Sequence, residues 1–355
     1  MKKVGLVTYH CSGNNGAIMQ MYALCRFLKE HGCDVHVIDI RHVEFDIHNI
    51  SEGNNIVVRL IKSALLPKRM HRIWSYLPAI TRHYLSMEDL RSDPPEYDYY
   101  VVGSDQVWNH KIARDRALAY FLDFGPDSVK RFSYASSFGL SNWEAGPYAS
   151  TEQVQKCFNR FKKISVREIE GKKILAEIFH KDATLVLDPT LLYDNYSELT
   201  GKIRQRREIV CYKMNKTADF FAMMPEVKRR LGMPALFLNH NYPKKGFKYQ
   251  FNPDTRTWLR KIAGAAFIVT DSFHGLAFSI IYRKQFVVIL NHNGKDSRLI
   301  TLCKVLHLED RMFGSMEEMC KTDAWLAPVD YAKAEPYLLS MREQSENFIL
   351  NALDE

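Results

Sequence analysis

The feature that most constrains the fold is a regular alternation of short apolar runs with longer segments of helical periodicity. Residues 4–9 form an apolar run, residues 12–16 are polar and glycine-rich, and residues 17–31 carry apolar side chains at helical spacing. Residues 34–40 form the next apolar run. This strand–turn–helix–strand opening is typical of an α/β domain in which helices join parallel strands.

The alternation continues through the chain in two blocks. In the first block we expect further strands at residues 99–103, 131–137, 163–167 and 184–187. After a charged stretch at 194–207, we expect strands at residues 208–213, 235–239, 266–270 and 286–290. A chain of 355 residues has room for two domains of ordinary size.

These blocks give the expected domain organisation. We predict one Rossmann-like domain over residues 1–195 and a second over residues 205–330. Residues 331–355 have apolar side chains at helical spacing, so we predict a C-terminal helix that packs back towards the first domain.

Composition excludes several classes of protein. The net charge of +8 is spread along the chain without zinc-finger spacing or an RNA-recognition motif, which disfavours nucleic acid and favours small anionic ligands. No apolar stretch is long enough to span a membrane, and no signal peptide is recognised. The seven cysteines form no CxxC pair, which favours a reducing compartment. We therefore expect a cytoplasmic protein.

One segment departs from the α/β pattern. Residues 56–86 contain no acidic residue but carry six lysines and arginines: Arg59, Lys62, Lys68, Arg69, Arg72 and Arg82. We interpret residues 50–95 as a basic insertion of helices and loops. Such an insertion either covers a substrate or contacts an anionic membrane or lipid-linked acceptor.

Polar residues after the expected strands indicate where ligands bind. In parallel α/β sheets, ligands lie beyond the carboxyl ends of the strands. The first block carries hydrogen-bonding side chains and an aromatic ring there, a combination suited to a sugar: Asp105, Gln106, Trp108 and Asn109. The second block carries Asp271, Ser272 and His274 after the strand at 266–270.

Several segments, in this order, resemble the polysaccharide pyruvyl transferase family: residues 4–9, 13–16, 97–109, 165–168, 188–192 and 270–275. The resemblance implies a GT-B-like fold, in which two Rossmann-like halves surround a central cleft. It also implies an enzyme that moves a pyruvyl group from phosphoenolpyruvate to a sugar hydroxyl and releases phosphate. The acceptor would be a capsular or exopolysaccharide sugar, or its lipid-linked precursor.

The resemblance assigns the donor to the second domain. His274 would protonate the enol methylene carbon or bind the phosphate, and its alternative is a buried structural histidine. Asp271 would act as a catalytic group or cap the following helix, and Ser272 would bind phosphate at that helix N-terminus. The family pattern often has arginine where this chain has Ser272, so another cation is needed, and Arg298 is the candidate.

The first domain would bind the acceptor, with one arginine directed at the donor. Arg167 would bind the carboxylate or phosphate of phosphoenolpyruvate, unless it forms an ion pair with a neighbouring glutamate. Asp105 would deprotonate the attacking hydroxyl, unless it is a turn residue and Trp108 lies in the core. The loop residues Asn14, Asn15 and Gly16 would face an anion or the acceptor, or form a plain turn.

Two other functions stay open on the same scaffold. One is a glycosyltransferase that uses a nucleotide sugar, and the other is a catalytically silent glycan-binding protein. The loop at 13–16 lacks GxGxxG spacing, which disfavours a dinucleotide. His10, His240 and His292 lack metal-ligand spacing, so we expect no metal and no cofactor.

Overall fold

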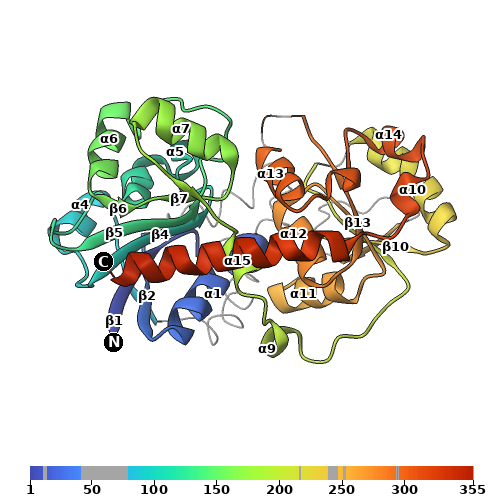
Figure 1. The fold of residues 1–355 in the computed structure, drawn as a ribbon, viewed down its shortest axis with the longest axis horizontal. Helices are drawn as coiled ribbons and strands as arrows, with labels where there is room; N and C mark the ends of the chain where they lie inside the picture. Colours follow the sequence, from blue (N-terminus) through green and yellow to red (C-terminus); the bar gives the residue numbers. More distant parts are fainter. Residues whose placement is uncertain are drawn as a thin grey trace, which may run out of the picture. The chain divides into compact units, whose positions relative to one another are not determined.

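The computed structural model describes residues 1–10, 14–40, 79–215, 217–238, 247–250, 253–292, 294 and 296–354. The contacts divide the chain into two compact units. Unit 1 comprises Met1–Tyr193 with Arg342–Glu355, and unit 2 comprises Asp194–Met341. Figure 1 shows the elements of each unit along the chain.

Unit 1 is built on a parallel sheet whose described strands have the order β3-β2-β1-β4-β5-β7-β8, with β6 also paired to β5. The strands are β1 Lys2–Val7, β2 Cys33–Asp39, β3 Ala79–His83, β4 Tyr99–Asp105, β5 Lys130–Ser136, β6 Phe161–Lys163, β7 Ser165–Val166 and β8 Thr184–Leu185. The chain reverses its direction of travel across the sheet between β1 and β4. This topological switch point is where ligands bind in open α/β sheets.

Helices cover both faces of this sheet, with α1 on one side and α6 and α7 on the other (Figure 1). The helices of the unit are α1 Asn15–Glu30, α4 Met87–Ser92, α5 His110–Ala113, the 3₁₀ helix η1 Arg114–Phe121, α6 Thr151–Asn159, α7 Ile169–Phe179 and α8 Pro189–Leu192.

The residues of β4 show why two helical layers are needed. Tyr99 and Val101 pack in the apolar cluster that contains α1, while Tyr100 and Val102 pack in the cluster that contains α6 and α7. Successive side chains of a strand point to opposite faces, so a strand that is apolar at every position must be covered twice.

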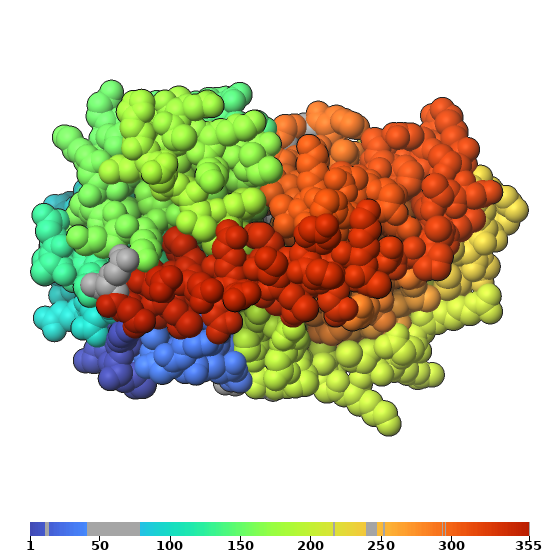
Figure 2. Space-filling model, viewed as in Figure 1, coloured from blue at the N-terminus to red at the C-terminus, as the bar shows by residue number. Residues whose placement is uncertain are grey.

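The C-terminal helix α15, Tyr331–Asp354, contributes its last turns to unit 1. Phe348, Ile349 and Leu353 are buried in the same cluster as α1. Lys2 Nζ lies 2.8 Å from Asp354 Oδ1, and the red end of the helix lies beside the blue N-terminal residues on the surface (Figure 2). The first and last described segments of the chain are thus joined in one unit.

Unit 2 contains a second parallel sheet, with the described order β11-β10-β9-β12-β13-β14. Its strands are β9 Ile209–Tyr212, β10 Ala235–Leu238, β11 Lys248–Gln250, β12 Phe267–Thr270, β13 Gln285–Ile289 and β14 Met312–Phe313. This is the 3-2-1-4-5-6 order of the Rossmann fold, and its switch point lies between β9 and β12.

The helices of unit 2 also form two layers. They are α9 Ser197–Thr200, α10 Ala218–Leu231, α11 Thr255–Gly264, α12 Phe273–Ile281, α13 Ser297–Val305, α14 Met316–Cys320, and the 3₁₀ helices η2 Glu309–Arg311 and η3 Ala324–Leu326. Cys211 and Val269 pack with residues of α10 and α14. On the other face, the Trp258 ring of α11 lies 5.2 Å from Tyr212 and 5.3 Å from Phe278 of α12.

The expected insertion at residues 50–95 is wrong at its C-terminal end. Residues 79–83 form strand β3, which pairs in parallel with β2, and residues 87–92 form α4. The strand was missed because it is a half-exposed edge strand with a single large apolar residue, Ile80. The basic residues from Arg59 to Arg72 lie outside the described residues.

Close packing of α12 on its strand depends on a glycine. A Cβ atom at Gly275 would lie 2.2 Å from Thr270 Oγ1 and 3.1 Å from Tyr212 Cδ1. Both neighbours are buried, and neither can move without disturbing the sheet.

We therefore expect Gly275→Ala to lower the free energy of unfolding by about 1–3 kcal/mol, as overpacked cores do. Urea denaturation followed by fluorescence measures this change. The control is Gly171→Ala in α7, where the nearest atom to the new Cβ is Val166 Cγ1 at 3.3 Å. A loss in the control as large as that in Gly275→Ala would contradict the packing argument.

Candidate functional site

In unit 1, the switch point brings together the residues that follow β1 and β4. β4 ends at Asp105, whose φ of 68° lies in the left-handed region. Val107 N and Ser137 N donate to its carbonyl oxygen at 2.8 and 3.1 Å, which holds this backbone conformation. Backbone strain of this kind persists where the surroundings enforce it, and it often marks functional sites.

The Asp105 carboxylate is held by two donors. Its Oδ1 accepts from Gln106 N at 2.9 Å and from Arg167 Nη2 at 3.1 Å. Tyr9, in the loop after β1, is close enough to Asp105 for the carboxylate to affect the pKa of its phenol. Burial raises the pKa of Tyr9 well above its usual value, and Tyr120 and Asp105 raise it further. Tyr9 is therefore a neutral phenol beside a carboxylate.

Arg167 lies among carboxylates. Its side chain is 1% exposed, and Nη1 donates to Asp188 Oδ2 at 2.5 Å and to Ser104 Oγ at 3.2 Å. Burial alone would lower the pKa of Arg167, but Asp188, Asp105 and Glu168 outweigh it and raise the pKa. Both Nη atoms donate to protein oxygens, and Nε lies 3.9 Å from Glu168 Oε2, the neighbouring glutamate of the alternative interpretation. The role in binding the donor stays a prediction, and in this structure Arg167 holds the Asp105 carboxylate.

Asp188 completes this network. Besides Arg167, its Oδ2 accepts from Ser104 Oγ at 2.7 Å, while Oδ1 accepts from Thr190 N at 3.0 Å and Thr190 Oγ1 at 2.7 Å. Asp188 is also the N-cap of α8. Sequence analysis included Asp188 in a family segment but gave it no role, because pairing between distant strand ends is invisible in the sequence.

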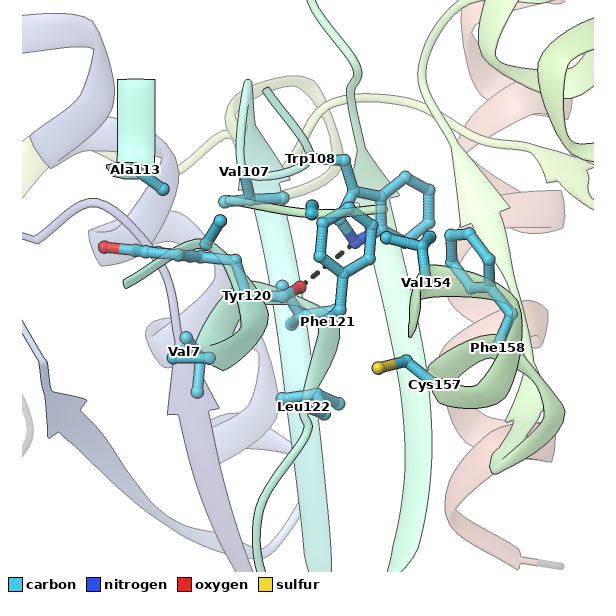
Figure 3. Packing of buried hydrophobic residues seen from close by; sticks show 14 of the residues in the cluster. Val7, Val107, Trp108, Ala113, Tyr120, Phe121, Leu122, Val154, Cys157 and Phe158 are labelled. Atoms are coloured by element: carbon cyan, nitrogen blue, oxygen red, sulfur yellow. Dashed lines mark hydrogen bonds between the residues drawn. The ribbon is translucent and has the colours of Figure 1, made fainter. Parts of the chain in front are cut away.

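The expected sugar-stacking role of Trp108 is wrong. Trp108 is 1% exposed, and its ring packs against Phe121, Phe138 and Phe158 with centroids 5.0–6.1 Å apart. Its Nε1 donates to Tyr120 O at 3.1 Å, the dashed line in Figure 3. A ring with both faces in the core offers no surface to a ligand.

The remaining residues of this segment lie near the strand end. Gln106 is half-buried and packs against Gly139, where a Cβ atom would meet its Oε1 at 2.2 Å. Asn109 is buried at the N-cap of α5, and its Oδ1 has no hydrogen-bond partner among the described residues. A buried carbonyl oxygen of this kind calls for a donor from water or a ligand.

The glycine-rich loop after β1 is described only from Asn14 onwards. Asn14 caps α1, because its Oδ1 accepts from Gly16 N at 2.9 Å, and Asn15 is buried in the first turn. Sequence analysis missed Gln20 in the same helix, which donates to Thr8 Oγ1 at 2.8 Å. This bond ties α1 to the carboxyl end of β1.

In unit 2, the switch point lies between the carboxyl ends of β9 and β12. Asp271 is neither a helix cap nor an open catalytic base. Its carboxylate accepts from Lys213 Nζ at 3.1 Å, Met214 N at 2.6 Å and Asn215 N at 2.9 Å. With three donors, this buried group fixes the loop after β9. Lys213 was not predicted as a site residue. It is the last residue of the strand predicted at 208–213, and this position could have indicated a place at the site.

His274 lies in the first turn of α12. Ser272 is the N-cap residue, and its side chain makes no capping hydrogen bond. Ser272 N donates to Thr270 Oγ1 at 3.0 Å, and Thr270 Oγ1 donates to Tyr212 O at 2.7 Å. These two hydrogen bonds join the end of β12 to the start of α12. His274 is buried.

Arg298 lies in the first turn of α13, which follows β13, the neighbour of β12. The preceding Asp296 accepts from Asn291 N at 3.1 Å and His292 N at 2.7 Å, which fixes the loop that leads to this helix. Since parallel neighbours end at one edge of the sheet, Arg298 follows the same edge as Ser272 and His274.

The part of the chain that the structure describes contains no group of three or more His, Cys, Asp or Glu side chains that could hold a metal ion. None of its helices is long and apolar enough to cross a membrane.

Taken together, the two sheets and their switch points define an α/β protein of the GT-B-like class, built from Rossmann-like units. The chain is similar to the UDP-GlcNAc 2-epimerase from Neisseria meningitidis, with 8% identity and a TM-score of 0.53 over 99% of both chains. A glycotransferase of kitacinnamycin gives 10% identity and a TM-score of 0.54, again over 99% of both chains. At these identities the likeness shows the fold alone.

A family model then gives the particular family. The model of the polysaccharide pyruvyl transferases matches residues 14–293, which is most of the chain. The protein therefore belongs to the polysaccharide pyruvyl transferase family, a family of enzymes, and the resemblance found in its motifs is confirmed. No curated protein sequence matches the chain.

The buried network around Arg167 yields a stability prediction. Arg167→Met leaves Asp105 and Asp188 without their shared cation, and we expect a loss of about 3–5 kcal/mol in the free energy of unfolding. Arg229→Met removes an exposed partner of Glu226 and should cost less than about 1 kcal/mol. Chemical denaturation of both variants measures the difference. Similar losses in the two would show that Arg167 is not the centre of a buried network.

Proposed function

We propose that this enzyme transfers a pyruvyl group from phosphoenolpyruvate to sugar hydroxyls of a surface polysaccharide or its lipid-linked precursor, and releases phosphate. The observation that carries the proposal is the start of α12, where Ser272 and His274 follow β12 at the switch point of unit 2. Membership of the polysaccharide pyruvyl transferase family supports the same reaction.

The N-terminus of α12 supplies the chemistry of an anion site. The first turn of a helix has backbone N–H groups without intrahelical acceptors, and its dipole favours a negative charge. The Ser272 hydroxyl is not used as a cap, so it is a suitable donor to the phosphate of phosphoenolpyruvate. Arg298, which follows the neighbouring strand β13, supplies positive charge at the same edge.

This assignment predicts the behaviour of the donor complex. Phosphoenolpyruvate should raise the thermal midpoint of the wild-type protein, since a ligand at 100 times its Kd stabilises by about 2.7 kcal/mol. Arg298→Met should remove most of that shift. Lys304→Met, in the exposed last turn of the same helix, should keep it. An unchanged shift in Arg298→Met would exclude this arginine from the donor site.

His274 is the proposed acid. Protonation of the methylene carbon makes C2 of phosphoenolpyruvate electrophilic, after which a sugar hydroxyl attacks and phosphate leaves. The positive end of α12 disfavours an imidazolium, whereas a bound phosphate favours it. Donor binding would therefore place a proton on the histidine just when the reaction needs one.

Phosphate release from phosphoenolpyruvate, measured with a panel of p-nitrophenyl glycosides as acceptors, tests this role. His274→Ala should reduce the rate at least about 100-fold while the donor-induced thermal shift persists. His274→Gln should be nearly as slow, because an amide donates a hydrogen bond but transfers no proton. If Gln restores most of the rate, His274 binds phosphate and the acid is another group.

Unit 1 is the proposed acceptor side. Two buried polar atoms after β1 and β4 have no hydrogen-bond partner among the described residues, Tyr9 Oη and Asn109 Oδ1. Such atoms suit sugar hydroxyls, which both donate and accept. Asn14, Asn15 and Gly16 start α1 at the same sheet edge, and Asp105 lies at the end of β4.

The fold also suits a glycosyltransferase that uses a nucleotide sugar, the alternative function. The similar structures include epimerases and a glycotransferase, although likeness of fold does not decide chemistry. The same assay separates the two. Release of UDP from UDP-sugars without phosphate release from phosphoenolpyruvate would replace the proposed function with the alternative, and a lack of either would favour a silent glycan-binding protein.

A further inference from the structure

Three neighbouring strands of unit 1 end in a cluster of two histidines and an aspartate that the proposed function does not use. Asp39 is the last residue of β2, His83 is the last residue of β3, and His10 follows β1. Asp39 Oδ1 lies 3.1 Å from His10 Nε2 and 3.3 Å from His83 Nδ1. The side chains are 5%, 2% and 23% exposed for Asp39, His10 and His83, respectively.

The contacts of His10 link the loop after β1 to Asp39. Its Nδ1 lies 3.1 Å from Thr8 O, and its Nε2 lies 3.1 Å from the Asp39 carboxylate. Thr8 O and the Asp39 carboxylate are both acceptors, so a ring N–H of His10 can donate to either one. His10 thus connects the loop after β1 to the end of β2.

The backbone holds Asp39 in place. Asp39 N donates to Thr81 Oγ1 at 3.0 Å, and Tyr84 N donates to Asp39 O at 2.8 Å. The pairing register of β2 with β3 shifts between Val37 and Asp39. After this shift, Asp39 is paired with His83 at the ends of the two strands. The carboxylate and His83 are therefore carried by a rigid part of the sheet.

His83 differs from His10 in its bonding. Both of its ring nitrogens are shielded from solvent, and neither makes a hydrogen bond among the described residues. Arg82 does not compete for Asp39, since it is paired with Asp89 and Asp93 at 2.9 Å. With the carboxylate on the Nδ1 side, the proton of a neutral His83 belongs on Nδ1 and the lone pair on Nε2. This is the arrangement of a general base.

We propose that His83, oriented by Asp39, is an acid–base residue that takes the proton from a ligand hydroxyl. The identity of that hydroxyl, on the acceptor sugar, rests on the proposed function. The hydroxyl proton passes to His83 Nε2 while the oxygen forms a bond to C2 of the donor, whose C3 has gained a proton.

The step balances without an outside reagent. When two hydroxyls form a ketal, two protons are released; one replaces the proton given to C3 and the other ends on the leaving phosphate. His83 therefore only relays protons and regains its starting form each cycle. Asp105 is less suited to this step, because its Oδ1 already accepts two hydrogen bonds.

The test uses His83→Ala, Asp39→Asn and a matched pair on the same strand. His36 and Asp34 form a half-exposed His–Asp pair near the start of β2, with 3.2 Å between His36 Nε2 and Asp34 Oδ1. In the phosphate-release assay, His83→Ala should lose at least about 100-fold in kcat while keeping the donor-induced thermal shift. Added imidazole should restore part of the rate. His36→Ala should stay within about twofold of wild type. A His83→Ala rate within about threefold of wild type would overturn the proposal.

A second measurement separates this proposal from the proposed function. ¹H–¹⁵N spectra of the imidazoles should show neutral His83 as the Nδ1–H form in wild type and as the Nε2–H form in Asp39→Asn. An Nε2–H form in wild type overturns the pairing of Asp39 with His83. If wild type releases no phosphate with any acceptor but the tautomer changes as expected, the proposed function fails and the acid–base pair stands.

Discussion

A single buried guanidinium organises the carboxyl edge of the sheet in unit 1. Arg167 follows β7, and it contacts Asp105 at the end of β4 and Asp188 after β8. These strand ends are far apart in the sequence and carry opposite charges, so the network forms only when the sheet has its native order. Asp105 Oδ1 accepts from Arg167 and from Gln106 N, so both contacts fix the position of this carboxylate. This edge of the sheet is thus built on an ion-pair network rather than on an apolar core alone.

The two units use charged groups of opposite sign to hold the residues that follow their strands. Each has a sheet in which the strand order reverses, and each collects polar side chains after the two strands at that reversal. Unit 1 uses Arg167 to hold carboxylates, whereas unit 2 uses the Asp271 carboxylate to hold Lys213 and two backbone N–H groups. In unit 1 the central residue was predicted to bind the donor, and in unit 2 it was predicted to be catalytic or to cap a helix; in the structure each holds neighbouring groups in place. The proposed acid, His274, lies beside Asp271 in unit 2.

The sequence was sufficient for the fold class and family, because apolar runs and motifs are local properties. It also located His274 at a strand-to-helix junction, as the structure shows. The pairing of Arg167 with Asp188 and the burial of Trp108 could not be predicted, since both depend on which distant segments pack together. The His10–Asp39–His83 cluster was missed for the same reason, and because β3 is an edge strand whose sequence lacks the apolar alternation.

Helix α15 has a consequence for how the protein is made. Its last turns fill the apolar cluster of unit 1, and Tyr99 Oη donates to Leu353 O from the middle of that cluster. A ribosome releases residues 342–354 only after all of unit 2 has been synthesised. Until then, the apolar cluster of unit 1 that contains α1 lacks the side chains of α15. The N-terminal unit is therefore the later one to reach its finished state, and its assembly is coupled to completion of the whole polypeptide.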